Sequence, residues 1–135
     1  MSKISVKYNG ELRVNLTHTL SKKSIITDAP LDNNGLGMSF SPTDLTASSL
    51  AACMITILGI HNSRKNWGIK GMDADVEKIM ESNPRRINKI IVDLNIKADS
   101  LSQKAKEEIQ ASALNCPVAL SLDKTIIQEV NLKFT

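Results

Sequence analysis

Residues 41–60 read SPTDLTASSLAACMITILGI, and this stretch decides the fold. Ser41 suits the N-cap of a helix, Pro42 suits its first position, and Asp44 can act as the acid of a capping box. From there to about residue 64 the pattern is apolar nearly all round, which is typical of a central helix covered on most sides. Such a helix would be about 33 Å long and needs more cover than one thin sheet provides. We therefore expect either a strongly curved sheet or a partner subunit around it.

Strands are expected on both sides of this helix, because apolar and polar residues alternate there. The predicted strands cover residues 3–8, 11–20, 24–27, 71–80, 86–98 and 124–134. Asn9-Gly10 predicts a hairpin turn between the first two strands. A second helix is expected from a cap at Ser100 or Ser102 to about residue 114, and a short third one over 117–122. This order predicts an α+β fold with mainly antiparallel pairing.

The composition excludes several classes of protein. A length of 135 residues predicts a single domain over 1–135. The net charge is only +3, no dense Lys/Arg run occurs, and four aromatic residues leave little for base stacking, so nucleic acid is not an expected partner. Two cysteines and two histidines without ligand spacing predict no metal site.

The beginning of the chain, MSKISVKYNG, alternates and carries charge, so it lacks the apolar stretch of a secretory signal. No window approaches the 18 or more apolar residues of a membrane span. We therefore expect a cytoplasmic protein with no membrane partner. Its cysteines are expected to be reduced thiols there.

The two cysteines lie in different settings. Cys116 directly precedes Pro117, so it is expected to cap a helical turn, where the helix N-terminus lowers the pKa of a thiol. Cys53 lies inside the apolar helix, where burial would raise its pKa unless a cation reaches it. From local sequence alone, Cys116 is predicted to be the more acidic thiol. Each cysteine is also compatible with simple packing, and the pair could face each other as a reversible disulfide.

Residues 28–40, DAPLDNNGLGMSF, are rich in Gly, Asn, Asp and Pro and predict a loop. The loop is long for a plain connector, and long loops in compact domains are often functional.

Two separated segments resemble the OsmC/Ohr family, the osmotically inducible and organic hydroperoxide resistance proteins. Residues 27–60, TDAPLDNNGLGMSFSPTDLTASSLAACMITILGI, are similar to the family's Gly-rich loop, capped helix start and first cysteine. Residues 113–122, ALNCPVALSL, are similar to its second cysteine element. Order and spacing agree along the whole chain, so the sequence resembles this family or a divergent OsmC-like branch of it.

The resemblance implies antiparallel sheets wrapping two long central helices in an intertwined homodimer. It also implies a thiol-dependent peroxidase that reduces organic hydroperoxides. Cys53 would attack the peroxide and become a sulfenic acid, and Cys116 would resolve it as a disulfide. An external dithiol such as dihydrolipoamide, or a lipoylated protein, would then reduce the disulfide, with no bound cofactor.

The same resemblance implies an arginine from the N-terminal region beside the first cysteine. Arg13 is the only arginine before residue 64, so it is the candidate. By the same resemblance, Gly37, Ser41, Pro42 and Thr43 would form the loop and substrate pocket.

The chain departs from the family pattern at one position. The well-known hydroperoxide reductases carry a Glu ten residues before the first cysteine, which holds the arginine, whereas this chain has Thr43 there. Asp44 lies about 180° from Cys53 around the helix, so its expected role is capping. The arginine clamp is therefore either rebuilt from other residues or absent. The alternatives are a weakly active or non-catalytic protein that binds a small apolar or thiol-reactive ligand, and a redox sensor.

Overall fold

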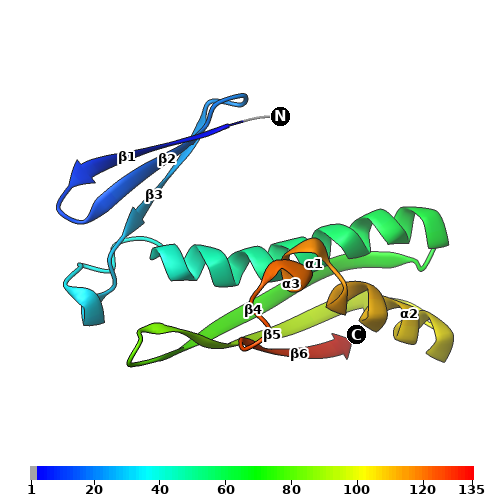
Figure 1. Ribbon diagram of the computed structural model, residues 1–135. Coiled ribbons are helices and arrows are strands. Elements are labelled where there is room, and N and C mark those ends of the chain that lie inside the picture. Colours follow the sequence, from blue (N-terminus) through cyan, green and yellow to red (C-terminus); the bar gives the residue numbers. More distant parts are fainter. Residues whose placement is uncertain (1–2) are drawn as a thin grey trace. The chain divides into compact units, whose positions relative to one another are not determined.

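Two three-stranded sheets form the framework of the computed structural model, which describes residues 3–135 (Figure 1). The chain divides into two units, one ending at Thr46 and one covering Ala47–Thr135, called unit 1 and unit 2 below. Each unit holds one sheet. The α+β class expected from the sequence is confirmed, and the assignment of 1–135 to a single domain stays a prediction.

Unit 1 is built on an antiparallel sheet in the order β1-β2-β3, formed by β1 (Ile4–Gly10), β2 (Arg13–His18) and β3 (Lys23–Asp28). The first hairpin is present, but the prediction of its turn at Asn9-Gly10 is wrong by two residues. The turn residues are Glu11 and Leu12, with φ of 55° and 63°. A register shift between Tyr8 and Gly10 adds one residue to β1, which carries the strand past the expected turn.

The long loop after β3 contains a short 3₁₀ turn, η1 (Leu31–Asn33), and leads into α1 (Pro42–Lys65). The predicted capping box at the start of α1 is confirmed. The Asp44 N–H donates to Ser41 Oγ at 3.0 Å, and the Ser41 N–H donates to Asp44 Oδ2 at 2.9 Å. The chain therefore enters α1 in a fixed direction.

Unit 2 contains the second sheet, in the order β4-β5-β6, formed by β4 (Ile69–Glu81), β5 (Arg86–Ala98) and β6 (Ile127–Phe134). β4 and β5 pair antiparallel, whereas β5 and β6 pair parallel. A parallel pair needs a crossover connection, which α2 (Gln103–Leu114) and α3 (Pro117–Ser121) provide. Ser102, one of the two predicted caps, accepts a hydrogen bond from Ala105 N at 3.1 Å and begins α2.

One face of α1 forms the core of unit 2 together with β5 and α2. The buried side chains of α1 are Ala47, Leu50, Ala51, Met54 and Leu58, and they recur at helical spacing. They pack in one cluster with buried residues of β5 and α2, among them Ile90, Leu94 and Ile109. The central position predicted for this helix is therefore confirmed within unit 2.

Much of α1 is left without cover by the described residues of unit 2. The expectation that no window approaches a membrane span is wrong for α1, which is long and apolar enough to cross a membrane by length and composition alone, a test that core helices of soluble proteins also pass. Only 28% of its most apolar 18-residue window is buried. The expectation that sheet cover within one chain would be insufficient for this helix agrees with that value.

Candidate active site

The structure brings the two cysteines together within unit 2. Cys53 lies in the middle of α1 and is half-buried, whereas Cys116 is fully buried. Cys53 lies close enough to Cys116 for its side chain to raise the pKa of the Cys116 thiol. Cys116 belongs to the core cluster and Cys53 packs against it. Both are free thiols, so the pair is a reduced dithiol with one partly exposed member.

The break between α2 and α3 places Cys116. Its φ and ψ of −69° and 153° are extended, and Pro117 follows as the first helical residue of α3. The predicted N-cap position of Cys116 is thus confirmed. The extended backbone ends α2 and sets the thiol at the start of the next short helix.

The predicted lowering of the pKa of Cys116 is wrong. Burial raises the pKa of the Cys116 thiol above its ordinary range, and the neighbouring Cys53 acts in the same direction. The backbone N–H groups of Ala119 and Val118, at the start of α3, lower this pKa, as the helix-end argument expects. Burial outweighs them, so Cys116 is held as a protonated thiol.

Arg13 is held by a buried carboxylate within unit 1. Its Nε lies 3.6 Å from Asp28 Oδ2, and its NH1 lies 3.8 Å from Oε2 of the exposed Glu11. Arg13 begins β2 and Asp28 ends β3, where the register places them directly opposite each other. The Arg13 side chain is 32% exposed. Asp28 restrains its guanidinium on one side, and part of the side chain remains accessible to solvent.

Asp28 was not identified from the sequence. Its side chain is 1% exposed, its Oδ2 accepts a hydrogen bond from Met38 N at 3.0 Å, and its Oδ1 has no partner within the described part of the chain. The predicted strand stopped at Thr27, one residue too early. Extending the strand by one residue and counting back through the hairpin would have paired Asp28 with Arg13.

Gly37 lies in the loop between β3 and α1. Its φ is +61°, and its N–H donates to Ala29 O at 3.1 Å. At a second glycine, Gly35, there is no room for any side chain, because a Cβ there would overlap the carbonyl oxygen of Ala29. The loop is therefore folded closely onto the residues that follow β3.

The remaining predicted residues form the first turn of α1. Ser41 is buried and caps the helix, and Pro42 is its first residue. The Thr43 hydroxyl lies 3.2 Å from Ser41 Oγ, so it takes part in the cap. Thr43 occupies the position where the resembled reductases carry the acid. Within unit 1, the buried acid that pairs with Arg13 is Asp28.

Arg13 belongs to unit 1, whereas the two cysteines belong to unit 2. Within unit 2, the dithiol can form a disulfide once one sulfur has been oxidised to a sulfenic acid. Within unit 1, the Arg13–Asp28 pair presents a fixed positive charge.

Residues 34–131 match the family model described as OsmC-like protein. No curated protein matches the chain. Among solved structures, a Psychrobacter arcticus protein described as a candidate osmotic stress induced and detoxification response protein is 42% identical, with a TM-score of 0.91 over 98% of this chain and 96% of that one.

Two more distant structures share the fold. An OsmC-like protein of Mycoplasma pneumoniae is 19% identical, with a TM-score of 0.84 over 100% of this chain and 97% of that one. An organic hydroperoxide resistance protein of Legionella pneumophila is 17% identical, with a TM-score of 0.75 over 98% of this chain and 96% of that one. The fold expected from the sequence is therefore found in full-length relatives.

Proposed function

Because the chain belongs to the OsmC-like family, we propose that it is a cysteine-based peroxidase that reduces organic hydroperoxides. The observation that carries the proposal is that the half-buried Cys53 lies beside the fully buried Cys116 at the core of unit 2. A peroxidase of this kind needs one thiol that a substrate can reach and a second, neighbouring thiol that can form a disulfide with it. Cys53 is partly exposed, as the thiol that meets the substrate must be, whereas Cys116 is fully buried.

The proposed reaction begins with the Cys53 thiolate. Its sulfur attacks one peroxide oxygen, the O–O bond breaks, and the alkoxide leaves as an alcohol after taking up a proton. Cys53 is then a sulfenic acid. The Cys116 sulfur attacks the Cys53 sulfur, its proton and the hydroxyl group leave as water, and a disulfide forms.

An external dithiol closes the cycle. We propose dihydrolipoamide or a lipoylated protein, because a dithiol can attack the disulfide, form a mixed disulfide and then release it by closing its own ring. Two electrons pass from the dithiol to the enzyme, which returns to the reduced state. The protein would work in the cytoplasm, where such reductants keep thiols reduced.

Arg13 is proposed as the cation that stabilises the Cys53 thiolate. A fixed guanidinium favours the charged form of a nearby thiol. The ion pair with Asp28 supports this role, because it restrains Arg13 although position 43 carries a threonine. Gly37, Ser41, Pro42 and Thr43 are proposed to shape the approach to the thiol.

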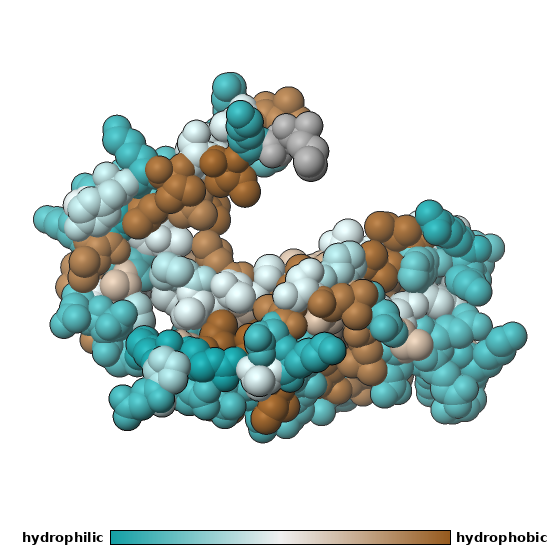
Figure 2. Space-filling model, viewed as in Figure 1, coloured by the Kyte–Doolittle hydropathy of each residue, from teal (hydrophilic) through white to brown (hydrophobic). Residues whose placement is uncertain are grey.

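A homodimer is proposed as the working form. Apolar side chains gather over the strands of unit 1 (Figure 2), where Ile4, Val6 and Tyr8 are each more than 60% exposed. Exposed apolar patches of this kind often mark protein–protein interaction sites. A second copy of the chain would cover such surfaces.

Mass spectrometry after peroxide treatment tests the mechanism. One equivalent of cumene hydroperoxide added to the reduced protein should remove two thiols, and tryptic peptides should contain a Cys53–Cys116 link. Cys116→Ser should stop at a sulfenic acid on Cys53 that a dimedone reagent traps. If the wild type loses no thiols, or if Cys53→Ser loses them equally, the proposal is wrong.

The weakly active or ligand-binding alternative rests on Thr43. If the arginine is not positioned for catalysis, steady turnover with dihydrolipoamide should equal a control without protein, even though the thiols react once. A redox sensor would also react once without turnover, but its disulfide would then exchange with a partner protein. Sustained turnover would favour the peroxidase over both.

A further inference from the structure

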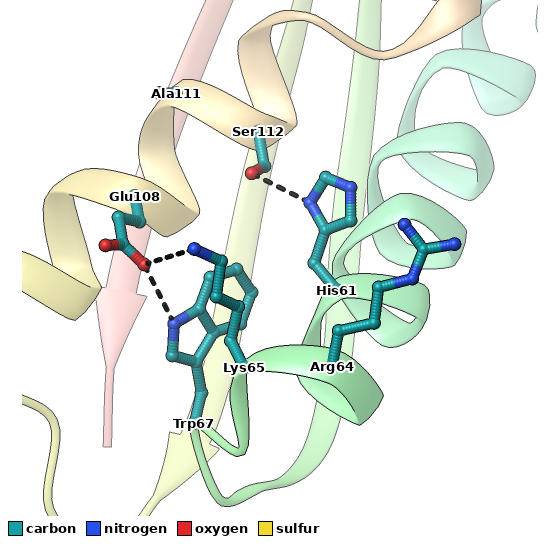
Figure 3. Close-up of a pocket in the computed structure, with 7 residues that line it drawn as sticks. All are labelled: His61, Arg64, Lys65, Trp67, Glu108, Ala111 and Ser112. Carbon is teal, nitrogen blue, oxygen red and sulfur yellow. Dashed lines mark hydrogen bonds and ion pairs between the residues drawn. The ribbon is translucent and has the colours of Figure 1, made fainter.

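A second pocket lies in unit 2, between the end of α1 and α2 (Figure 3). It has a volume of about 400 Å³, within the range of small-molecule sites. Its lining residues are His61, Arg64, Lys65, Trp67, Glu108, Ala111 and Ser112. None of these residues belongs to the proposed thiol chemistry. His61 follows Cys53 by eight residues, about 12 Å along the helix axis.

Hydrogen bonds hold the walls of this pocket in place. His61 Nδ1 lies 3.0 Å from Ser112 Oγ, which joins α1 to α2 (Figure 3). The buried Trp67 donates its Nε1–H to Glu108 Oε2 at 3.4 Å, and its ring meets the His61 ring edge-on with centroids 6.3 Å apart. The histidine, the tryptophan and the serine are therefore oriented before any ligand arrives.

Of the charged side chains that line the pocket, Arg64 has no ion-pair partner among the described residues. Lys65 Nζ lies 4.0 Å from Glu108 Oε2, so these two residues offset each other. Arg64 makes no hydrogen bond or ion pair with any residue of 3–135. His61 and Arg64 are three residues apart on α1 and share a face, as Figure 3 shows, with the second ring nitrogen of His61 turned to the side of the guanidinium.

We propose that this pocket binds the carboxylate of a small organic acid. The planar guanidinium of Arg64 can donate two parallel hydrogen bonds to a carboxylate. When Ser112 donates to Nδ1 of His61, the ring proton lies on Nε2, which can donate to the same anion. The apolar part of the acid would lie along Ala111 and the exposed edge of Trp67.

A monocarboxylate fits this pocket better than a phosphate. One guanidinium is unpaired and the neighbouring lysine is already matched by Glu108, so the pocket offers one net positive charge. A phosphate group that carries nearly two negative charges at pH 7 would leave charge uncompensated. The volume also exceeds what an inorganic ion fills, which favours an acid with an organic body.

Trp67 provides a direct readout, because it is the only tryptophan of the chain. Titration of the ¹⁵N-labelled full chain with sodium benzoate, at constant ionic strength, should shift the Trp67 indole N–H resonance in a saturable way. Benzamide, which has the same shape without the charge, should bind at least about tenfold more weakly. Inorganic phosphate should not displace benzoate at equal concentration.

Matched variants locate the anion. Arg64→Gln should weaken benzoate binding by about tenfold or more, and Arg64→Lys should fall between the two because it keeps the charge but loses the second hydrogen bond. Lys124→Gln removes one positive charge outside the pocket and should change the affinity less than about twofold. Unchanged amide spectra of the exposed Arg64 variants would show that they fold.

The proposal is overturned by any of four results. These are the absence of a saturable shift with benzoate, equal weakening by Arg64→Gln and Lys124→Gln, equal binding of benzamide, and tighter binding of phosphate. Because the readout is binding rather than peroxide turnover, failure of the thiol mechanism would leave this test intact.

Discussion

At the scale of single residues, the two cysteines differ in their burial and therefore in the roles proposed for them. Cys116 sits at a helix start, a position that on its own would make a thiol acidic, yet full burial raises its pKa. Cys53 is the member of the pair that solvent reaches. A resolving thiol that stays protonated until its partner is oxidised fits the proposed cycle, because it does not compete for the peroxide.

The raised pKa of Cys116 predicts a loss of stability in base. Below the pKa of an unfolded cysteine, about 8.5, both states are protonated and the full contribution is present. As the pH rises from there through the higher pKa of the folded state, the unfolded state loses its proton first, and stability falls. Urea unfolding of the reduced protein between pH 8 and 10.5 measures this slope.

Cys116→Ala is the matched control for this slope. It should be less stable at every pH, because the side chain is fully buried, but its stability should fall less steeply above pH ~8.5. The same slope in the variant and the wild type would show that Cys116 is not responsible.

Asp28 is expected to act through Arg13. Asp28→Asn keeps an oxygen for the Met38 N–H but removes the charge that restrains Arg13, so peroxide turnover should fall by about tenfold. The pH profile of Cys53 alkylation should move to higher pH in this variant, a change that a merely structural role would not cause.

Glu11→Gln is the control for Asp28→Asn. Glu11 also lies near Arg13, at 3.8 Å, but its side chain is 83% exposed, so solvent weakens the pair and little change is expected. Thr43→Glu introduced into Asp28→Asn tests rescue at the position where the resembled reductases carry their acid. If Asp28→Asn leaves turnover and the alkylation profile unchanged, Arg13 does not depend on Asp28.

At the scale of elements, hydrogen bonds hold the loop between β3 and α1, and the first turn of α1, in one arrangement. Asp28 N–H donates to Phe40 O at 3.0 Å, and Ser39 Oγ donates to Ile26 O at 2.7 Å, so the C-terminal end of the loop is tied to β3. The capping box then fixes the start of α1. The proposed pocket loop is thus held by backbone hydrogen bonds rather than by a large core.

Gly35→Ala should destabilise the protein by about 1–3 kcal/mol, because the new Cβ would overlap the backbone of Ala29, which cannot move aside like a flexible side chain. Urea unfolding monitored by circular dichroism measures the loss. Gly71→Ala in β4 is the control, since its Cβ would meet only Lys97 Cδ at 3.9 Å. Equal stability of the two variants would contradict the close approach in the loop.

At the scale of the whole molecule, the exposed apolar surface is the dominant feature. One face of the unit 1 sheet carries Ile4, Val6 and Tyr8 on β1, opposite Leu16 and Val14 on β2. Strands with one apolar face need something to cover it. No described residue of unit 1 covers this face, and a partner subunit is the proposed cover.

Light scattering should therefore give a mass of twice the 14.8 kDa of the chain. Val6→Glu places a charge on the apolar face and should shift the protein towards monomer. Lys7→Glu changes a residue on the other face of the same strand and should leave the dimer intact. A monomeric wild type, or equal dissociation by both variants, would contradict the proposed interface.

The sequence by itself determined the elements and their order. Alternation predicted β1, β2 and β4, and a mostly apolar run predicted β5. Ser41, Pro42 and Asp44 predicted the start of the long helix, and the Cys116-Pro117 pair predicted the break between α2 and α3. These features are local, because caps, proline and periodicity act over a few residues. The turn at Asn9-Gly10 was displaced because a bulge depends on pairing with another strand.

Only the tertiary structure decided how the functional groups meet. The contact of Cys53 with Cys116, the choice of Asp28 as the partner of Arg13, and the joining of His61 to Ser112 each link residues far apart in the chain or across a hairpin. The direction of the Cys116 pKa shift was likewise set by burial, which local sequence does not reveal. The physical reason is the same in each case: burial and charge pairing depend on what the rest of the chain brings alongside a residue, whereas helices and strands are set by its immediate neighbours.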